Sequence, residues 1–254
     1  MATTQFPREN GYSRPLAFRN ERIISNPLEG VPIAAVAGIG RYAAHFDDFV
    51  QYPGPLTAGT GAGYAVLIST VAQEPELNSG GVLSVTTGGQ LGSDSTLYAA
   101  GLSKRAVLMS KIRTATPAAD TLGVGLVTAG VNLAAADGAD EIVLEVDGPA
   151  GQLQIRTQKD SGGVVTTAST NTQLNTLLTT TTEFYLLGLV QNRDNSVEGW
   201  VSTTGGETWV KAITLPATEA SLPDETSDLL DAVYLHVAGT GPGLIDWTTL
   251  GVER

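Results

Sequence analysis

The sequence predicts an all-β protein, an antiparallel β-sandwich that follows an extended N-terminal arm. From Ala44 onward, short runs rich in β-branched and aromatic residues alternate with Gly, Asn, Asp and Pro clusters, a spacing typical of antiparallel sandwiches. Glycine is abundant, with 30 residues, and helical periodicity is nearly absent. Charged residues make up 16% of the chain, below the roughly 25% typical of soluble domains. A sandwich of this length is commonly a single domain.

The predicted arm covers residues 1–43 and differs in composition from everything after it. Pro7, Pro15, Pro27 and Pro32 recur through it, and proline resists both helix interiors and central strands. Its basic residues outnumber its acidic ones, although the whole chain has a net charge of -12. We therefore divide the chain into an attachment arm, residues 1–43, and a β-sandwich domain, residues 44–254.

The strands of the sandwich are expected wherever β-rich runs fall between turn signals. The expected strands are Ala44–Phe49, Tyr64–Ala72, Val82–Thr86, Thr96–Gly101, Arg105–Thr114, Leu122–Ala129, Glu141–Val146, Gln152–Gln158, Gly163–Ala168, Phe184–Gln191, Val197–Thr203, Trp209–Ile213, Ala232–Ala238 and Ile245–Val252.

Several of these runs alternate with period two, so that one face of the strand is buried. Leu153 and Ile155, for example, alternate with Gln154 and Arg156. Helices are expected only as short connectors, at Thr172–Leu178 and Ser227–Asp231.

Composition excludes several classes of function. A net charge of -12 argues against nucleic-acid binding, which needs Lys and Arg to neutralise phosphates. No cysteine is present, so disulfides, thiol chemistry and Cys-based zinc sites are excluded. No run approaches the about 20 apolar residues that cross a membrane as a helix. The apolar stretch Val31–Ile39 is badly placed for a signal peptide, so we expect a soluble, unprocessed chain with no membrane partner.

The first and last strands carry a family resemblance. Phe46, Asp47, Asp48 and Phe49 open the first expected strand, and the run from Ile245 to Val252, which includes Asp246 and Trp247, forms the last. This pattern resembles the concanavalin A-like jelly rolls, the family of laminin G domains, legume lectins and laminarinase-type glycanases. The resemblance spans residues 44–254 and implies a jelly-roll sandwich whose first and last strands pair in one sheet.

A glycanase within this family would place its carboxylates at alternate positions of one strand, flanking the scissile bond. Glu141, Glu145 and Asp147 share the alternation of a single strand, so all three could face one side. Where the resemblance requires the second glutamate, however, the chain has Pro149. Gly148 and Pro149 are expected to end the strand, so we interpret the segment as an exposed acidic face closed by an Asp-Gly turn.

The segment from Ser202 to Trp209 is similar to the Asp-box of sialidases, a structural β-hairpin with a tryptophan packed beneath it. Thr204 stands where the family has aspartate, and there is one copy. Gly205 and Gly206 suit the tight turn. We expect a hairpin with a buried Trp, and because the family uses this box structurally, the resemblance implies no enzymatic activity.

Sugar binding would need exposed aromatic rings. The possible glycan-binding residues are Trp200, Trp209 and Trp247, although each sits in a strand pattern, where a half-buried core position is common. Calcium could be bound by oxygen ligands from Asp47, Asp48, Asn132 and Asp137. No recognised calcium-loop spacing supports this, so we expect no metal.

The sequence shows no motif for nucleophilic catalysis or nucleotide binding. His45 and His236 each lie within an expected strand, and no Gly-x-Ser-x-Gly elbow or phosphate loop is present. Gly59, Gly61 and Gly63 are interpreted as a flexible loop because no helix pattern follows. We predict no catalytic residue and no cofactor.

A cationic arm before a sandwich without a catalytic set resembles a tailed-bacteriophage virion protein, of the capsid decoration or cement type. This implies a non-enzymatic protein on the capsid exterior, assembled in the host cytoplasm, which stabilises the shell through its arm. Its partners would be the major capsid protein and copies of itself, as a dimer or trimer. The expected partner-binding residues are Phe6, Arg8, Tyr12, Arg14, Leu16, Phe18, Arg19, Arg22, Ile23 and Ile24.

Two alternatives remain open. One is a carbohydrate-binding or host-adhesion module of a phage tail or capsid exterior, with a surface glycan as its partner. The other is a divergent glycanase, whose hydrolysis would depend on Glu145 or Glu141.

Overall fold

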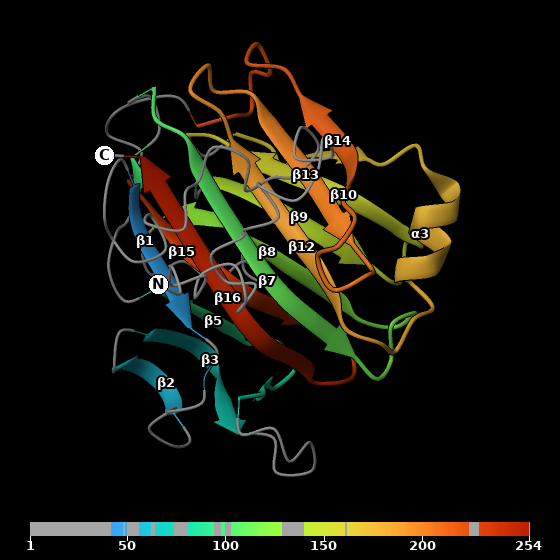
Figure 1. Cartoon of the computed structure of the whole chain (residues 1–254). Coiled ribbons are helices and arrows are strands. Elements are labelled where there is room, and N and C mark those ends of the chain that lie inside the picture. The colour runs from blue at the N-terminus through green and yellow to red at the C-terminus, as the bar shows by residue number, and fades with distance from the viewer. Residues whose placement is uncertain are drawn as a thin grey trace, which may run out of the picture.

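The computed structural model describes residues 42–47, 49, 56–61, 64–73, 81–93, 98–99, 103–128, 140–160, 162–223 and 229–253. The arm residues before 42 and their predicted attachment side chains lie outside this part of the chain. Two antiparallel sheets form a β-sandwich (Figure 1), so the predicted fold class is confirmed.

One sheet, here called the front sheet, has the strand order β4-β16-β7-β12-β13-β14, with β1 also paired to β16. Its strands are β1 (Tyr42–Asp47), β4 (Leu83–Val85), β7 (Ala106–Thr114), β12 (Tyr185–Gln191), β13 (Val197–Ser202), β14 (Val210–Leu215) and β16 (Gly243–Glu253). The pairing of β1 with β16, with Phe46 opposite Thr249, confirms that the first and last predicted strands share a sheet.

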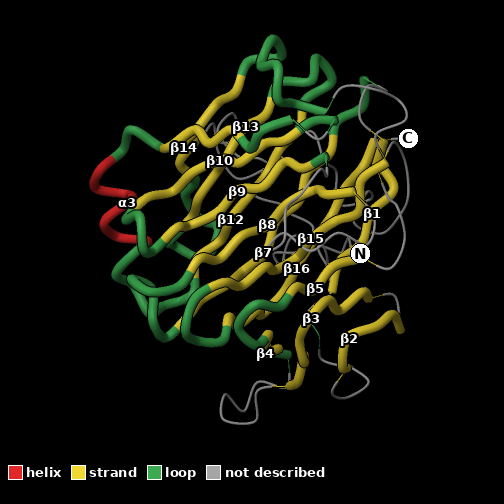
Figure 2. The backbone as a smooth tube through the Cα atoms, turned by 180° about the vertical axis from the view of Figure 1, so that it is seen from behind, coloured by secondary structure: helices red, strands yellow, loops and turns green. Residues whose placement is uncertain are grey.

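The other sheet, here called the back sheet, has the order β11-β10-β9-β8-β15-β5-β3, with β2 paired to β3 and β6 to β15 (Figure 2). Its strands are β2 (Leu56–Gly61), β3 (Tyr64–Gln73), β5 (Gln90–Ser93), β6 (Tyr98–Ala99), β8 (Thr121–Thr128), β9 (Glu141–Asp147), β10 (Gln152–Gln158), β11 (Val165–Ala168) and β15 (Leu229–Ala238). β3 also pairs with β4, which connects the two sheets at one side.

The main core lies between the sheets and is built from the inward positions of the alternating strands. Leu144 on β9, Ile155 on β10 and Leu187 on β12 are fully buried there. Gly199 on β13 marks a close approach of the layers, because a Cβ at this position would lie 2.8 Å from Leu144 Cδ1. The predicted alternation of β10 is confirmed, since Ile155 enters this core and Arg156 lies on the opposite face.

The one described α-helix, α3 (Thr172–Leu178), has the predicted bounds. Asn171 caps its first turn by accepting a hydrogen bond from the Leu174 amide at 3.0 Å. Asn175 ties the helix to β10, because its Oδ1 accepts from the Leu153 amide at 3.2 Å. α3 therefore lies as a connector at the edge of the sandwich (Figure 2).

Two expectations about the chain's local structure are wrong. The expected helix at Ser227–Asp231 overlaps β15, whose Leu230 pairs with Thr128 of β8, so sheet pairing overrides the short helical pattern. The expected loop around Gly59 and Gly61 contains β2, which forms a hairpin with β3. The short strand β5 is not predicted by its sequence, because the residues Gln90–Ser93 have little β-propensity.

Asp120, between β7 and β8, connects the ends of several strands. Its buried carboxylate accepts hydrogen bonds from the hydroxyls of Thr114 and Thr116. It also accepts from the amides of Thr240, at 2.7 Å, and Gly241, at 2.9 Å, which precede β16. Burial acts to raise the pKa of Asp120, but these hydrogen bonds outweigh it and hold the pKa below its usual value. Asp120 thus fixes the end of β7 relative to the start of β16.

Candidate functional site

The three tryptophans gather on the outer face of the front sheet. Trp200 comes from β13, Trp209 directly precedes β14, and Trp247 belongs to β16. All three pack into one cluster that is separate from the main core, together with Val107, Met109 and Val190. We call this cluster the tryptophan face. The residues are far apart in sequence, and the order β16-β7-β12-β13-β14 brings them together.

The three rings differ in accessibility. Trp200 is 6% exposed, its indole N–H donates to Glu198 Oε2 at 2.9 Å, and Lys211 Nζ lies 5.7 Å from its ring centroid. Trp209 and Trp247 are half-buried. Trp200 is therefore a packed support, whereas the other two can offer part of a ring surface.

Ion pairs border the tryptophan face. Lys211 Nζ lies 3.2 Å from Glu198 Oε1, and Lys111 Nζ lies 2.5 Å from Asp246 Oδ2. A register shift between Ile245 and Trp247 makes Asp246 an additional residue in β16, and such a bulge redirects side chains. Partly buried aromatic surface edged by charged hydrogen-bonding groups is suited to a polyhydroxylated ligand.

The Trp209 hairpin follows the Asp-box expectation in part. Gly205 and Gly206 have φ values of 66° and 94°, as the tight turn requires. Thr204 Oγ1 accepts from the Thr208 amide at 2.9 Å, so a hydroxyl ties the turn where the family has a carboxylate. Trp209 is half-buried rather than fully buried, and its indole nitrogen finds no hydrogen-bond partner among the described residues.

The outer face of the back sheet holds the acidic residues of β9. Arg156 on the neighbouring strand β10 pairs with Glu141, with Nε 2.8 Å from Oε1, and with Glu145, with Nη1 3.6 Å from Oε2. Gln154 Nε2 donates to Glu145 Oε1 at 2.7 Å and to Asp147 Oδ2 at 3.4 Å. These five residues form what we call the acidic network, which confirms that the three carboxylates share one side of β9.

Two of the three carboxylates of the acidic network, those of Glu141 and Glu145, are buried, which contradicts the exposed acidic face expected from the sequence. Glu141 is 0% exposed and Glu145 is 2% exposed. Burial raises the pKa of both carboxyls, against the opposing effect of the Arg156 guanidinium. The physical reason for the difference is that Arg156 and Gln154 supply partners, and a charged group can be buried when it is paired and hydrogen-bonded.

His236 on β15 lies in the same transverse row as Glu145, with Gly123 of β8 between them. It is 2% exposed, and burial, assisted by the Arg156 charge, lowers its pKa to about 4. The expectation that His236 lies within a strand is confirmed, and burial keeps it neutral at physiological pH.

The strand end bears on the glycanase alternative. β9 ends at Asp147, and Asp147 Oδ1 accepts from the Ala150 amide at 3.1 Å in the turn that follows. Pro149 is exposed within this turn. The predicted Asp-Gly turn is thus confirmed, and no acidic side chain occupies the position that the glycanase resemblance requires.

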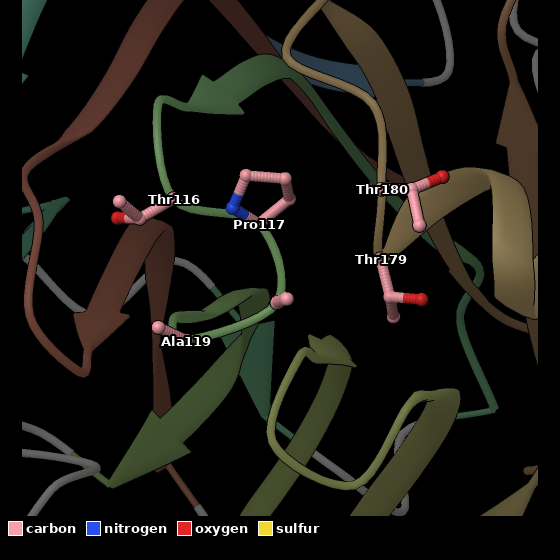
Figure 3. Close-up of a pocket in the computed structure, with 6 residues that line it drawn as sticks. Thr116, Pro117, Ala119, Thr179 and Thr180 are labelled. Atoms are coloured by element: carbon pink, nitrogen blue, oxygen red, sulfur yellow. The ribbon is translucent and has the colours of Figure 1, made fainter.

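A small pocket of about 360 Å³ opens between the β7–β8 turn and the end of α3. Figure 3 shows Thr116, Pro117 and Ala119 on one side and Thr179 and Thr180 on the other. Ala118 completes its lining. Since none of these side chains ionises, the pocket has no charged group with which to bind or activate a substrate.

The possible calcium ligands Asp48, Asn132 and Asp137, for which no metal is expected, lie outside the described residues, as does the side chain of Asp47. Within the described residues, no group of three or more His, Cys, Asp and Glu side chains could hold a metal ion. No helix in the same part of the chain is long and apolar enough to span a membrane.

Comparison with known proteins reveals similarity in structure only. No protein-family model and no curated protein sequence match the chain. Arcelin-5, a lectin-like defence protein from Phaseolus vulgaris, superposes with a TM-score of 0.54 at 10% identity, covering 85% of this chain and 100% of that protein. The chain has the concanavalin A-like jelly-roll fold.

Lectins and glycan hydrolases both share this fold. The lectin UEA-II, solved in complex with galactose, has a TM-score of 0.54 at 10% identity and covers 85% of this chain and 100% of its own. A beta-1,3-glucanase from Mycobacterium marinum has a TM-score of 0.51 at 13% identity, with 83% and 99% covered. At such identities the similarity establishes the jelly-roll architecture and leaves function to the residues of the site.

Proposed function

We propose that the protein binds carbohydrate at the tryptophan face and does not hydrolyse it. The observation that carries this proposal is the convergence of Trp209 and Trp247, both only partly buried, on one face bordered by the Lys111–Asp246 and Lys211–Glu198 pairs. Aromatic rings offer an apolar surface to the C–H face of a sugar, and charged side chains hydrogen-bond its hydroxyls. Similarity in fold to a lectin solved with galactose supports the same reading.

The acidic network supports binding without hydrolysis. A glycanase needs two carboxyl groups that flank the scissile bond, one of them as a proton donor. The raised pKa of Glu145 would suit a proton donor, but its side chain is buried and held by Gln154 and Arg156. A divergent glycanase would show hydrolysis that Glu145→Gln abolishes. We expect no hydrolysis of glucans by the unaltered protein.

The proposal is tested by measuring glycan binding on an oligosaccharide array and then by calorimetry with the best ligand. We expect Trp247→Ala and Trp209→Ala each to weaken binding about fivefold or more, since stacking on one aromatic ring contributes on the order of 1 kcal/mol or more. Val165→Ala, which alters an exposed apolar side chain on β11 of the other sheet, is the matched control and should bind normally. Unchanged binding by both tryptophan variants would refute the tryptophan face as the site.

This proposal favours the carbohydrate-binding alternative over the capsid-cement role. The cement role, its location on a virion, the capsid partner and a dimeric or trimeric state stay predictions, because they depend on arm residues outside the described chain. Deleting residues 1–41 tests them: loss of particle attachment by a folded, glycan-binding domain would assign the arm to assembly.

A further inference from the structure

Beside the tryptophan face, β7 presents two basic residues next to an aromatic ring. The guanidinium carbon of Arg113 lies 4.8 Å from the ring centroid of Phe184, and Lys111 Nζ lies 5.2 Å from the same centroid. Residues two apart on a strand share a face, so Lys111, Arg113 and the tryptophan face point to the same side of the front sheet. We call Lys111, Arg113 and Phe184 the basic corner.

Lys111 and Arg113 differ in what already satisfies their charge. Lys111 pairs with Asp246. Arg113 forms no ion pair within the described residues, and its Nε is buried without a hydrogen-bond acceptor. A buried N–H without an acceptor costs free energy, and the Phe184 ring compensates only the charge, through its π face. No described carboxylate therefore neutralises the Arg113 guanidinium.

The register sets the distance between the basic corner and the nearest tryptophan. Trp247 lies opposite Lys111 across the β16–β7 ladder, and Leu244 lies opposite Arg113. Arg113 is thus a diagonal neighbour of Trp247, at a separation of about 7–8 Å between backbone positions. A single sugar ring with a charged substituent can bridge this separation, with its ring against Trp247 and its substituent at Arg113.

We propose that the ligand of the tryptophan face is an anionic glycan, whose carboxylate or sulfate group is bound by Arg113. This inference rests on the proposed function and specifies its ligand class. A planar guanidinium can donate two parallel hydrogen bonds to an oxyanion, and the Phe184 ring lies 4.8 Å from the guanidinium carbon of Arg113. Because the chain carries a net charge of -12, the overall field repels polyanions, so the preference arises from this local contact.

The experiment compares matched glycans by calorimetry with the full chain. Polygalacturonate oligomers and their carboxyl-reduced counterparts test a carboxylate, and dextran sulfate against dextran tests a sulfate ester. We expect one of the anionic glycans to bind at least tenfold more tightly than its neutral counterpart. Arg113→Gln should abolish this preference and retain the affinity for the neutral glycan, and Arg113→Lys should restore it only in part, because it keeps the charge and loses the planar fork.

A matched control removes a positive charge elsewhere on the front sheet, just after the end of β12. Arg193→Gln alters an exposed arginine that pairs with Glu253, and it should keep the preference. Equal binding of neutral and anionic glycans, or a preference that survives Arg113→Gln, would overturn the inference while leaving carbohydrate binding intact. Failure of every glycan to bind would overturn the proposed function as well. Near-ultraviolet circular dichroism verifies that each variant is folded.

Discussion

Removing the Asp120 carboxylate should destabilise the sandwich by separating the end of β7 from the start of β16. In Asp120→Ala, the amides of Thr240 and Gly241 lose their acceptor, as do the hydroxyls of Thr114 and Thr116. The hydroxyls can rotate to other partners, so the two amides dominate the cost. Each orphaned donor costs about 1–3 kcal/mol, and we expect a total loss of about 3 kcal/mol in the free energy of unfolding.

Urea denaturation at neutral pH, followed by tryptophan fluorescence, measures this loss. Because the pKa of Asp120 is lowered in the folded state, its stabilisation is present at neutral pH and disappears as the pH falls through that pKa. The difference between wild type and variant should therefore narrow in acid. Asp194→Ala is the control, since that carboxylate accepts hydrogen bonds from Ser196 in an exposed turn. A loss below about 1 kcal/mol, or a difference that does not narrow in acid, would refute the reasoning.

Three further predictions concern the back sheet. The folded pKa of His236 is about 4, below its unfolded value of about 6.5, so its contribution to stability is complete above pH 6.5 and is lost toward pH 4. Over this range the free energy of unfolding should fall by about 3 kcal/mol more in the wild type than in His236→Gln. Parallel pH profiles of the two proteins would contradict this. Arg156→Met leaves Glu141 and Glu145 buried without a cation, so it should lower the free energy of unfolding by about 3 kcal/mol at pH 7 and by less at pH 4.5, where the carboxyls take up protons. A loss in urea titrations that does not depend on pH would argue against the ion pairs. Gly125→Ala should lower the free energy of unfolding by about 2 kcal/mol, because its Cβ would lie 2.6 Å from the Ile142 carbonyl oxygen. The control Gly163→Ala, whose Cβ would meet no atom within 4 Å, should melt at the wild-type temperature. Equal melting temperatures for both variants would show that the back sheet shifts to accommodate the added methyl group.

Local alternation made much of the fold predictable. β10 has the predicted bounds, and β9 differs by a single residue at its end, because apolar and polar residues alternate along both strands and burial of one face requires this pattern. Strands without such a pattern were missed: β2, Leu56–Gly61, and β5, Gln90–Ser93, contain glycine and small polar residues. They are strands because their neighbours in the sheet pair with them.

The candidate site was less predictable than the fold. Trp200, Trp209 and Trp247 were recognised singly, and no sequence signal connected them. Arg113 and Phe184 were missed altogether, since one basic residue in a strand and one aromatic residue 71 positions later show no relation in sequence. The partners of Glu141 and Glu145 were missed for the same reason, and an exposed acidic face was expected in place of a buried network.

The sequence by itself determined the all-β class, the strand faces and the missing second glutamate at Pro149, because alternation, turn residues and motif spacing are local properties. Only the tertiary structure decided which strands became neighbours. The order β16-β7-β12-β13-β14 placed three tryptophans and Arg113 on one surface, and the β8-β9-β10 order buried the acidic residues against Arg156. Strand order depends on long-range pairing and on packing between sheets, and a local pattern of residues does not specify either.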